Sequence, residues 1–334
     1  RNKRSVTINL KTEAGIMLFY RLIKNADIVM HNFKVGVAER LGIDHATLRE
    51  HKSNIITAVA TGLGTRGPHA SQGVFDILGM ARSGAMHALR YPNNDYQYLA
   101  SFGLADQVGA LILAQGISMA LLARERFGTG QEVEASQLAS MLLLQQMGLT
   151  RQLLNGTGPA SPDRQESPNP LFCVYPAYGD RWFAIGGLQP DRYWTDFCQM
   201  LEKPEWIEHP DFIDMEARKK NARTLVNQLD TIFINQSREV WLKKLVALDI
   251  PCAPVNDYVD LIGDSQVIAN KYITEIEHPT AGSIPAVGLA IKLSETPGGI
   301  QSTAPELGQH TEQWLLEEGL SWEEIESLKN LNAI

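Results

Sequence analysis

The first 150 residues of the chain alternate short runs rich in β-branched and apolar residues with longer runs that have helical spacing. The strand-like runs are "SVTINL", "ADIVMHNF" and "NIITAVATG". Helical runs over residues 12–24 and 35–50 separate them, and further helices follow up to about residue 150. Strands and helices that alternate at this pitch form a parallel sheet with helices on both faces. The sequence therefore predicts an α/β fold.

A second domain is predicted beyond a stretch dense in Gly, Pro, Ser and Asn, "NGTGPASPDRQESPNP", which is typical of a linker. "LFCVYPAYGDRWFAIGGL" then predicts a hairpin with "YGD" as its turn. Polar helical segments run to about residue 250, and residues 312–331 predict a pair of acidic helices separated at "GLS". Ser321 and Glu324 form a capping box at the start of the second. A chain of 334 residues favours two domains over one.

Composition and cysteine usage exclude several classes of protein. The net charge of −8 disfavours a broad surface for nucleic acid or for an anionic membrane. The three cysteines are far apart in the sequence and predict reduced thiols in a cytoplasmic protein. The histidines lack metal-ligand spacing, so we expect no metal site. We also expect no membrane span and no signal peptide, because the longest apolar run, residues 108–123, contains polar residues and ends in charge.

One carboxylate stands at the head of this apolar run, in "SFGLADQVGALILAQGISMALLARER". The spacing of the apolar residues after Asp106 predicts a helix buried on most sides. One interpretation of Asp106 is a helix cap, because an Asp side chain there satisfies free backbone N–H groups. The other is a nucleophile, since helix N–H groups keep a carboxylate ionised and Gly103 and Gly109 leave room for a substrate.

The motif "TGLGTRGP", residues 61–68, matches GxGxxG and follows a predicted strand. A dinucleotide site would need a helix that begins inside the motif, but Pro68, His69 and Gly73 delay it. No acidic residue ends a strand about twenty residues further on to bind a ribose. We favour a turn-rich loop beside a ligand and keep an NAD(P)-binding oxidoreductase as an alternative function.

A basic turn is predicted within "MHNFKVGVAERLG". Asn32 and Phe33 fall at the carboxyl end of a strand, where ligands of open α/β sheets bind. Lys34 follows, and Arg40 lies on the first turns of the next helix, whose N-terminus beside two cations suits a phosphate group. The segment is either a phosphate-binding turn or a basic turn exposed to solvent.

Several motifs occur in a fixed order along the chain. They are "NKRSVTINLKT", "DIVMHNFKVGVAERLG", "AVATGLGTRGP", "GVFDILGMARSGAM", "GLAD", "ERFGTGQEVEASQLAS" and "HPTAGSI" followed by "APELGQHTEQWL". Together they closely resemble the class III CoA-transferases, the family of the formyl-CoA:oxalate and carnitine CoA-transferases. The resemblance covers almost the whole chain, and several motifs in order are more specific than any one of them.

The resemblance implies a reaction and a set of site residues. Asp106 matches the family's nucleophile, which attacks a donor acyl-CoA to give an aspartyl mixed anhydride and then an aspartyl-CoA thioester. CoA then passes to a small carboxylic acid. Acyl-CoA is thus a substrate, and no permanently bound cofactor is expected. The residues implied to line the CoA pocket are Ile8, Asn9, Leu10, Lys11, Asn32, Phe33, Lys34, Arg40 and Phe75.

The family also contains α-methylacyl-CoA racemases, which place a histidine acid/base in the motif that matches "GVFD". Phe75 stands at that position, and because a phenyl ring transfers no proton, CoA transfer is favoured over racemisation. A racemase of the same fold stays an alternative, as does a catalytically inactive binding protein.

The resemblance also implies an architecture, in which each chain of an interlocked homodimer threads through the other. The family's first βαβ unit precedes the first of the motifs above, so we expect this sequence to lack it. The expected parts are a Rossmann-like large domain at 1–150, a linker at 151–170, a small α/β domain at 171–260, a return linker at 261–300 and C-terminal helices at 301–334 that pack on the large domain.

Overall fold

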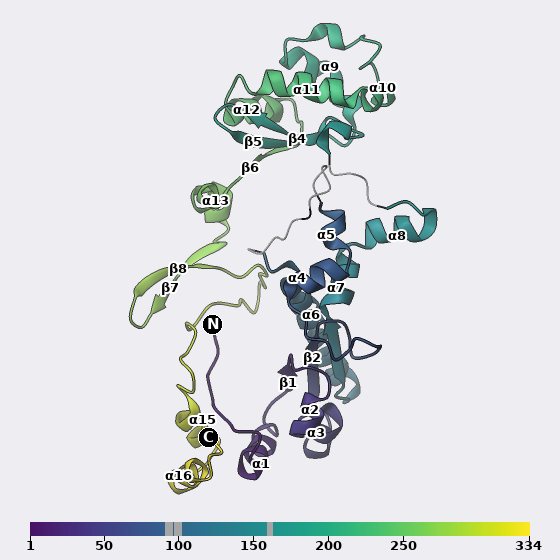
Figure 1. Cartoon of the computed structure of the whole chain (residues 1–334). Helices are drawn as coiled ribbons and strands as arrows, with labels where there is room; N and C mark the ends of the chain where they lie inside the picture. The colour runs from purple at the N-terminus through teal and green to yellow at the C-terminus, as the bar shows by residue number, and fades with distance from the viewer. Residues whose placement is uncertain (91–95, 97–101, 159–162) are drawn as a thin grey trace. The chain divides into compact units, whose positions relative to one another are not determined.

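The computed structural model describes residues 1–90, 96, 102–158 and 163–334. The chain divides into two compact units (Figure 1). Unit 1 consists of Arg1–Ala160 and Gln301–Ile334, and unit 2 is Ser161–Ile300. The chain therefore leaves unit 1 once and returns to it with its C-terminal residues.

Unit 1 contains a parallel sheet of three strands in the order β1-β2-β3, namely Ile28–His31, Ile56–Thr61 and Glu132–Ser136. The central strand β2 carries the fully buried side chains of Ile56 and Ala58. A parallel sheet in a mixed α/β fold is as predicted. The strand β3 was not predicted, because its glutamates are exposed and the strand lacks the continuous apolar run of a buried parallel strand.

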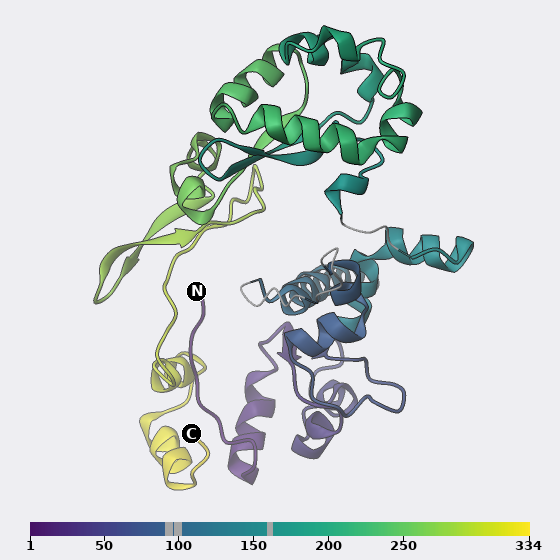
Figure 2. The ribbon, with the colours of Figure 1, turned by 45° about the horizontal axis from the view of Figure 1, so that its top comes forward.

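The run "SVTINL" does not form a strand, which corrects one expectation. Its polar groups pair with the C-terminal segment instead: His310 N donates to the Ser5 carbonyl at 2.9 Å, and Thr7 N donates to Thr311 Oγ1 at 3.0 Å. Figure 2 shows the N-terminal segment running beside the C-terminal helices. The backbone polar groups of this segment thus pair with loop and side-chain atoms rather than with a neighbouring strand.

The helices of unit 1 come from both of its chain segments. The helix expected over residues 35–50 is two helices, because Gly42 takes a left-handed conformation with φ of 71° and ends the first. The two C-terminal helices contribute Leu315 and Ile325 to a core with Leu18 and Leu22. The bounds are α1 Glu13–Leu22, α2 Val37–Leu41, α3 His45–His51, α4 Asp76–Arg82, α5 Ala85–Ala88, α6 Leu104–Phe127, α7 Gln137–Leu144, α8 Gln146–Asn155, α15 Thr311–Glu317 and α16 Trp322–Asn330.

Helix α6 lies on the sheet through one face only. Leu113 packs with Ala58 and Ala135, and a Cβ on Gly116 would lie 2.6 Å from Val133 Cγ1. Other apolar side chains, including Leu111, Met119 and Leu122, are more than half exposed. The expectation of a helix buried on most sides is therefore wrong for the single chain.

The same helix bears on the expectation that the chain has no membrane span. Among the described residues, α6 is the one helix whose length and composition would allow it to cross a membrane. This is weak evidence for a membrane segment, since the core helix of a globular protein meets the same criterion.

Unit 2 contains an antiparallel sheet in the order β4-β5-β6, formed by Phe172–Ala177, Arg181–Gly186 and Cys252–Val255. The predicted hairpin is β4 and β5, with Gly179 and Asp180 at positive φ in its turn. The core of unit 2 is aromatic, with Phe183, Phe197 and Phe233 fully buried. The helices are α9 Pro190–Met200, α10 Met215–Lys220, α11 Ala222–Phe233 and α12 Arg238–Ala247, with short 3-10 turns at Arg164–Glu166 and Pro204–Trp206.

The later part of the predicted linker and the predicted return linker belong to unit 2. Arg164 makes two hydrogen bonds to the Asp230 carboxylate of α11, at 2.8 and 2.5 Å. The segment expected as a return linker contains two short helices and a hairpin. These are α13 Tyr258–Gly263, α14 Ser265–Ala269, β7 Ile273–His278 and β8 Gly282–Val287.

Candidate active site

Asp106 lies in the first turn of α6, and its side chain is exposed. The N-cap residue is Gly103, whose φ of 51° is left-handed and whose position makes no side-chain cap. Asp106 itself is beyond the cap position, so the interpretation of this carboxylate as the helix cap is wrong. Its oxygens are left available for other partners.

The cap of α6 is supplied from another helix. Asp76, the first residue of α4, is only 6% exposed, and its Oδ1 accepts the backbone N–H groups of Ala105 at 2.7 Å and of Asp106 at 3.0 Å. These are two of the free N–H groups that begin every helix. Gly79 lets the two helices approach, because a Cβ there would lie 3.0 Å from Ala105 Cβ. Asp76 thus fixes where Asp106 stands.

Gln137 is the second neighbour of Asp106. It is the first residue of α7, directly after β3, and its Nε2 donates a hydrogen bond to Asp106 Oδ1. The sequence reasoning missed both Asp76 and Gln137 as site residues. The available signal was that both lie inside motifs that carry the family resemblance, "GVFD" and "EASQLAS".

The glycine-rich loop lies at the carboxyl edge of the same sheet. Leu138 N donates to the Gly62 carbonyl at 3.0 Å, which joins the start of α7 to the loop after β2. Glu134 of β3 holds the loop further along, since its carboxylate accepts Thr65 N at 2.7 Å and Thr65 Oγ1 at 2.8 Å. The next helix, α4, begins only at Asp76, so the loop does not open a helix as a dinucleotide motif does.

The predicted basic turn is at the same edge, after β1. Asn32, Lys34 and Arg40 are all exposed. Phe33 stacks on His31 with 5.2 Å between ring centroids, and its N–H donates to His31 Nδ1 at 3.3 Å. Burial lowers the pKa of His31, which favours the neutral ring that accepts this bond.

A cavity of about 460 Å³ lies between the glycine-rich loop and α4. Lys34 approaches it, because a Cβ on Gly73 would lie 3.1 Å from Lys34 Nζ. Arg82 adds a second cation to the lining. The cavity is lined by Leu63, Gln72, Gly73, Val74, Leu78, Ala81 and Arg82.

The first four predicted CoA residues lie elsewhere in unit 1. Ile8 packs against the core of α1 and the C-terminal helices, and Leu10 against that of α1 to α3. Asn9 Nδ2 donates to the Asn332 carbonyl at 3.0 Å, and its Oδ1 accepts Lys11 N at 3.2 Å. Lys11 is exposed. Asn9 therefore has local structural partners, and a role for these four residues in CoA binding stays a prediction.

Phe75 is the N-cap residue of α4, directly before the capping Asp76, and is 78% exposed. It stands beside the cavity-lining Val74 and offers an apolar face rather than an acid or base. The next histidine along the chain, His87, has its own partner, since its Nδ1 lies 3.3 Å from Tyr96 Oη.

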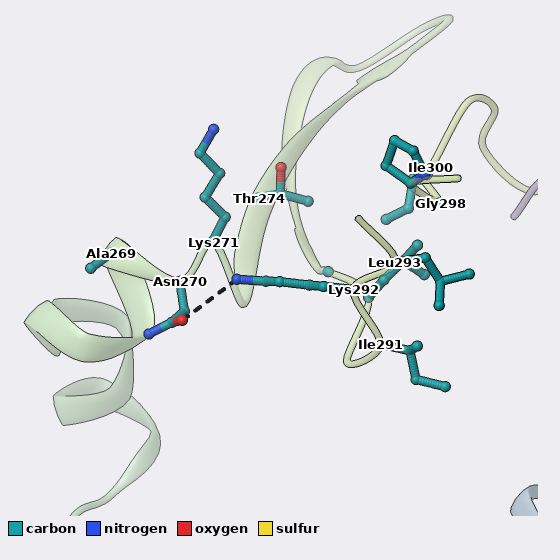
Figure 3. A pocket seen from close by; sticks show the side chains of 13 residues that line it. Ala269, Asn270, Lys271, Thr274, Ile291, Lys292, Leu293, Gly298 and Ile300 are labelled. Carbon is teal, nitrogen blue, oxygen red and sulfur yellow. Dashed lines mark hydrogen bonds between the residues drawn. The ribbon is translucent and has the colours of Figure 1, made fainter. Parts of the chain in front are cut away.

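A second cavity, of about 500 Å³, lies within unit 2 and contains none of the predicted site residues (Figure 3). Its cations are Lys271 and Lys292. Lys292 Nζ donates to Asn270 Oδ1 at 3.5 Å and lies 5.4 Å from the centroid of the Tyr272 ring, while Lys271 extends away from the other side chains in Figure 3. The lining offers no carboxylate or thiol nucleophile.

The residues that the structure describes contain no group of three or more His, Cys, Asp or Glu side chains placed to hold a metal ion. Cys173, Cys198 and Cys252 are free thiols. Burial raises the pKa of Cys198 to about 12, so this thiol is protonated at neutral pH.

A parallel sheet whose carboxyl edge holds a glycine-rich loop, a cavity and a carboxylate on a helix start is the arrangement of an α/β enzyme. The family model for CoA-transferase family III matches residues 1–311, and the chain belongs to this family. It is therefore an enzyme of the CoA-transferase type.

Named relatives and solved structures agree with this membership. The chain is 32% identical over 334 residues to an acyl-CoA transferase of Fusarium pseudograminearum, covering 98% of this chain and 72% of that protein. It is 29% identical to the formyl-CoA:oxalate CoA-transferase of Streptomyces avermitilis, covering 100% and 84%. A CAIB/BAIF family protein of Brucella suis has a similar structure, with a TM-score of 0.84, 25% identity and coverage of 95% and 82%.

Proposed function

We propose that this chain transfers coenzyme A from an acyl-CoA donor to a small carboxylic acid, with Asp106 as the nucleophile. The observation that carries the proposal is the Asp106 carboxylate, exposed on the first turn of α6 and held there by Asp76 and Gln137. Relatives are named for such reactions, among them the succinyl-CoA--D-citramalate CoA-transferase of Chloroflexus aurantiacus, 27% identical over 318 residues.

The proposed reaction needs only carboxylate and thiolate chemistry. Asp106 attacks the thioester carbonyl, the C–S bond breaks, and an aspartyl mixed anhydride and CoA thiolate form. The thiolate attacks Asp106 Cγ and releases the donor acid, leaving an aspartyl-CoA thioester. The acceptor carboxylate then reverses both steps, so the energy of one thioester is conserved in the next.

The CoA moiety is proposed to lie at the carboxyl edge of the parallel sheet. The loop after β2, the cavity beside α4 and the exposed Lys34 and Arg40 offer backbone, apolar and cationic surfaces there. Cations beside exposed backbone suit the phosphates of CoA. Acyl-CoA is a substrate in this proposal, and a cytoplasmic location is part of it.

A second copy of the chain is the proposed partner, in an interlocked homodimer. The support is the apolar surface left open on one copy. The exposed apolar residues of α6, α7 and α8 include Leu111, Met119, Leu122, Leu142, Leu143, Leu144, Met147, Leu153 and Leu154. Apolar surface of this extent is typical of an interface. Light scattering on purified protein tests the proposal, and a monomer at micromolar concentration would contradict it.

The test of the nucleophile uses Asp106→Asn, with Asp196→Asn on an exposed helix position of unit 2 as the control. The wild-type protein and the control should transfer CoA from succinyl-CoA to a short carboxylate. They should also form a CoA adduct on the peptide that contains Asp106, which hydroxylamine cleaves. Asp106→Asn should do neither while it melts at the wild-type temperature. Transfer activity retained by Asp106→Asn would overturn the assignment.

The racemase alternative is separated by a second assay. A racemase exchanges the α-proton of a 2-methylacyl-CoA with solvent and needs no acceptor acid. Incubation in D₂O with and without a carboxylate acceptor should give no deuterium uptake by the acyl group. Uptake without an acceptor, and without an adduct at Asp106, would favour the racemase.

A further inference from the structure

The side chain of Gln137 is placed by the backbone around it. Ser136 Oγ caps α7 by accepting a hydrogen bond from Ala139 N at 3.1 Å. Leu138, which follows Gln137, donates its own N–H to the glycine-rich loop. The absence of a side chain on Gly79 leaves space for the amide, because a Cβ there would lie 2.8 Å from Gln137 Oε1. The amide therefore reaches Asp106 from a fixed point at the end of β3.

The orientation of this amide follows from charge. An ionised carboxylate only accepts hydrogen bonds, so the nitrogen of Gln137 and not its oxygen faces Asp106. Gln137 Oε1 is buried and has no hydrogen-bond partner among the residues the structure describes. The side chain is thus arranged for its one bond to Asp106.

We infer that Gln137 is a positioning residue for Asp106 and donates to the oxygen that becomes negatively charged during transfer. The inference rests on the proposed function. Because Gln137 occupies Oδ1, the other oxygen of Asp106 is the one free to attack the donor thioester. That oxygen enters the anhydride bond, and Oδ1 becomes the carbonyl oxygen of the aspartyl group.

The same hydrogen bond then acts in the second step. When CoA thiolate adds to Asp106 Cγ, the electron pair of the carbonyl moves onto Oδ1, where the N–H of Gln137 already lies. The bond from Cγ to the donor acyl oxygen breaks, and the donor acid departs with that oxygen. A hydrogen-bond donor that is already in place when the negative charge develops lowers the barrier of this step, because no group has to move to stabilise the charge. The N–H of Gln137 also stabilises the charge on Oδ1 when the acceptor acid attacks the aspartyl thioester.

Loss of Gln137 should therefore slow attack on the aspartyl carbonyl more than attack on the donor thioester, whose charge falls on a substrate oxygen. The aspartyl anhydride would then persist longer before the CoA thiolate attacks it. Water that attacks its acyl carbon releases the donor acid and restores Asp106, with free CoA as the other product. A higher ratio of acyl-CoA hydrolysis to CoA transfer is the specific signature.

The first test compares Gln137→Leu with Gln145→Leu. Gln145 is the control because its amide bonds backbone carbonyls, those of Met141 at 2.9 Å and Ser83 at 3.3 Å, and not Asp106. We expect Gln137→Leu to lower kcat about a hundredfold to a thousandfold and to raise the ratio of hydrolysis to transfer. The control should keep the wild-type kcat and ratio.

The second test is the pH profile of Gln137→Glu. The active form of this variant holds one proton, on the new carboxyl, which then donates to the Asp106 carboxylate. Two carboxylates in contact cannot both ionise easily, and above the second pKa of the pair the donor is lost. Activity should recover toward acid pH and fall as pH rises, a limb that the wild-type protein lacks.

The outcomes separate this inference from the proposed function. A wild-type protein that forms no adduct at Asp106 refutes both. An adduct in the wild type, together with unchanged kcat, hydrolysis ratio and pH profile in the two Gln137 variants, refutes the role of Gln137 alone. A fall in kcat with an unchanged hydrolysis ratio and no new pH limb would assign Gln137 a structural role and also overturn the inference.

Discussion

The carboxylate of Asp76 accepts the backbone N–H of Asp106 at 3.0 Å, so α6 begins on a cap that comes from α4. The cap ties the position of Asp106 to α4, which also lines the 460 Å³ cavity. The proposed nucleophile and the proposed substrate surface are therefore both in contact with one short helix. The buried Asp76 side chain is one of the contacts that set their relative position.

Replacing Asp76 with Ala should lower both stability and turnover. Loss of a helix cap destabilises a protein by about 0.5 to 2 kcal/mol, and the first turn of α6 would shift with Asp106 on it. The matched control is Asp44→Ala, which removes the cap of α3 by taking away the acceptor for Thr47 N at 3.1 Å. Thermal melts and transfer rates should show similar stability losses but a fall in kcat for Asp76→Ala alone. Equal kcat values in the two variants would contradict the positioning role.

Replacing Arg40 with Ala should weaken CoA binding about tenfold to a hundredfold, because the proposed charge-assisted hydrogen bond from Arg40 to a CoA phosphate would be lost. The choice of carboxylic acid should not change. Arg49, exposed on α3, provides a control of the same charge. Calorimetric titration with CoA measures the effect, and an unchanged Kd for Arg40→Ala would remove this residue from the pocket.

Replacing Glu134 with Gln should raise the KM for acyl-CoA more than it lowers kcat. The change weakens the two hydrogen bonds that hold Thr65 and so loosens the glycine-rich loop, without touching Asp106. Thr65→Val removes only the hydroxyl bond and should have a smaller effect of the same kind. Steady-state kinetics of the two variants test this order, and a larger effect of Thr65→Val would argue against it.

Cys198 should resist alkylation at pH 8.5, whereas the half-buried Cys173 and Cys252 react first. Its pKa is about 12 in the folded chain against 9.0 when exposed, so between these values the folded state keeps a proton that the unfolded state has lost. The raised pKa of Cys198 therefore adds to the free energy of unfolding. This contribution is fully present below pH 9 and declines as pH rises toward 12. Mass spectrometry after alkylation, and pH-dependent melts of Cys198→Ala beside the wild type, measure both effects. Early labelling of Cys198 would refute the prediction.

Much of the fold could be predicted because its signals are local. The hairpin of β4 and β5 follows from aromatic alternation about a turn that Gly179 can adopt, and the capping box of Ser321 and Glu324 is present as predicted. The strand β3 and the two-part helix before residue 51 could not be predicted as reliably. The strand β3 lacks a continuous apolar run, and Gly42 ends a helix only when its backbone turns left-handed.

By itself the sequence determined that Asp106 heads a long apolar helix and that its motifs are those of one enzyme family. Those facts depend on residue order alone. Only the tertiary structure decided what the carboxylate contacts, because Asp76 and Gln137 are 30 and 31 residues away along the chain. Their meeting depends on the packing of α4 and α7 against the start of α6. The cap of α6 therefore comes from Asp76 and not from Asp106, since the side chain that satisfies a helix start can come from any element that packs there.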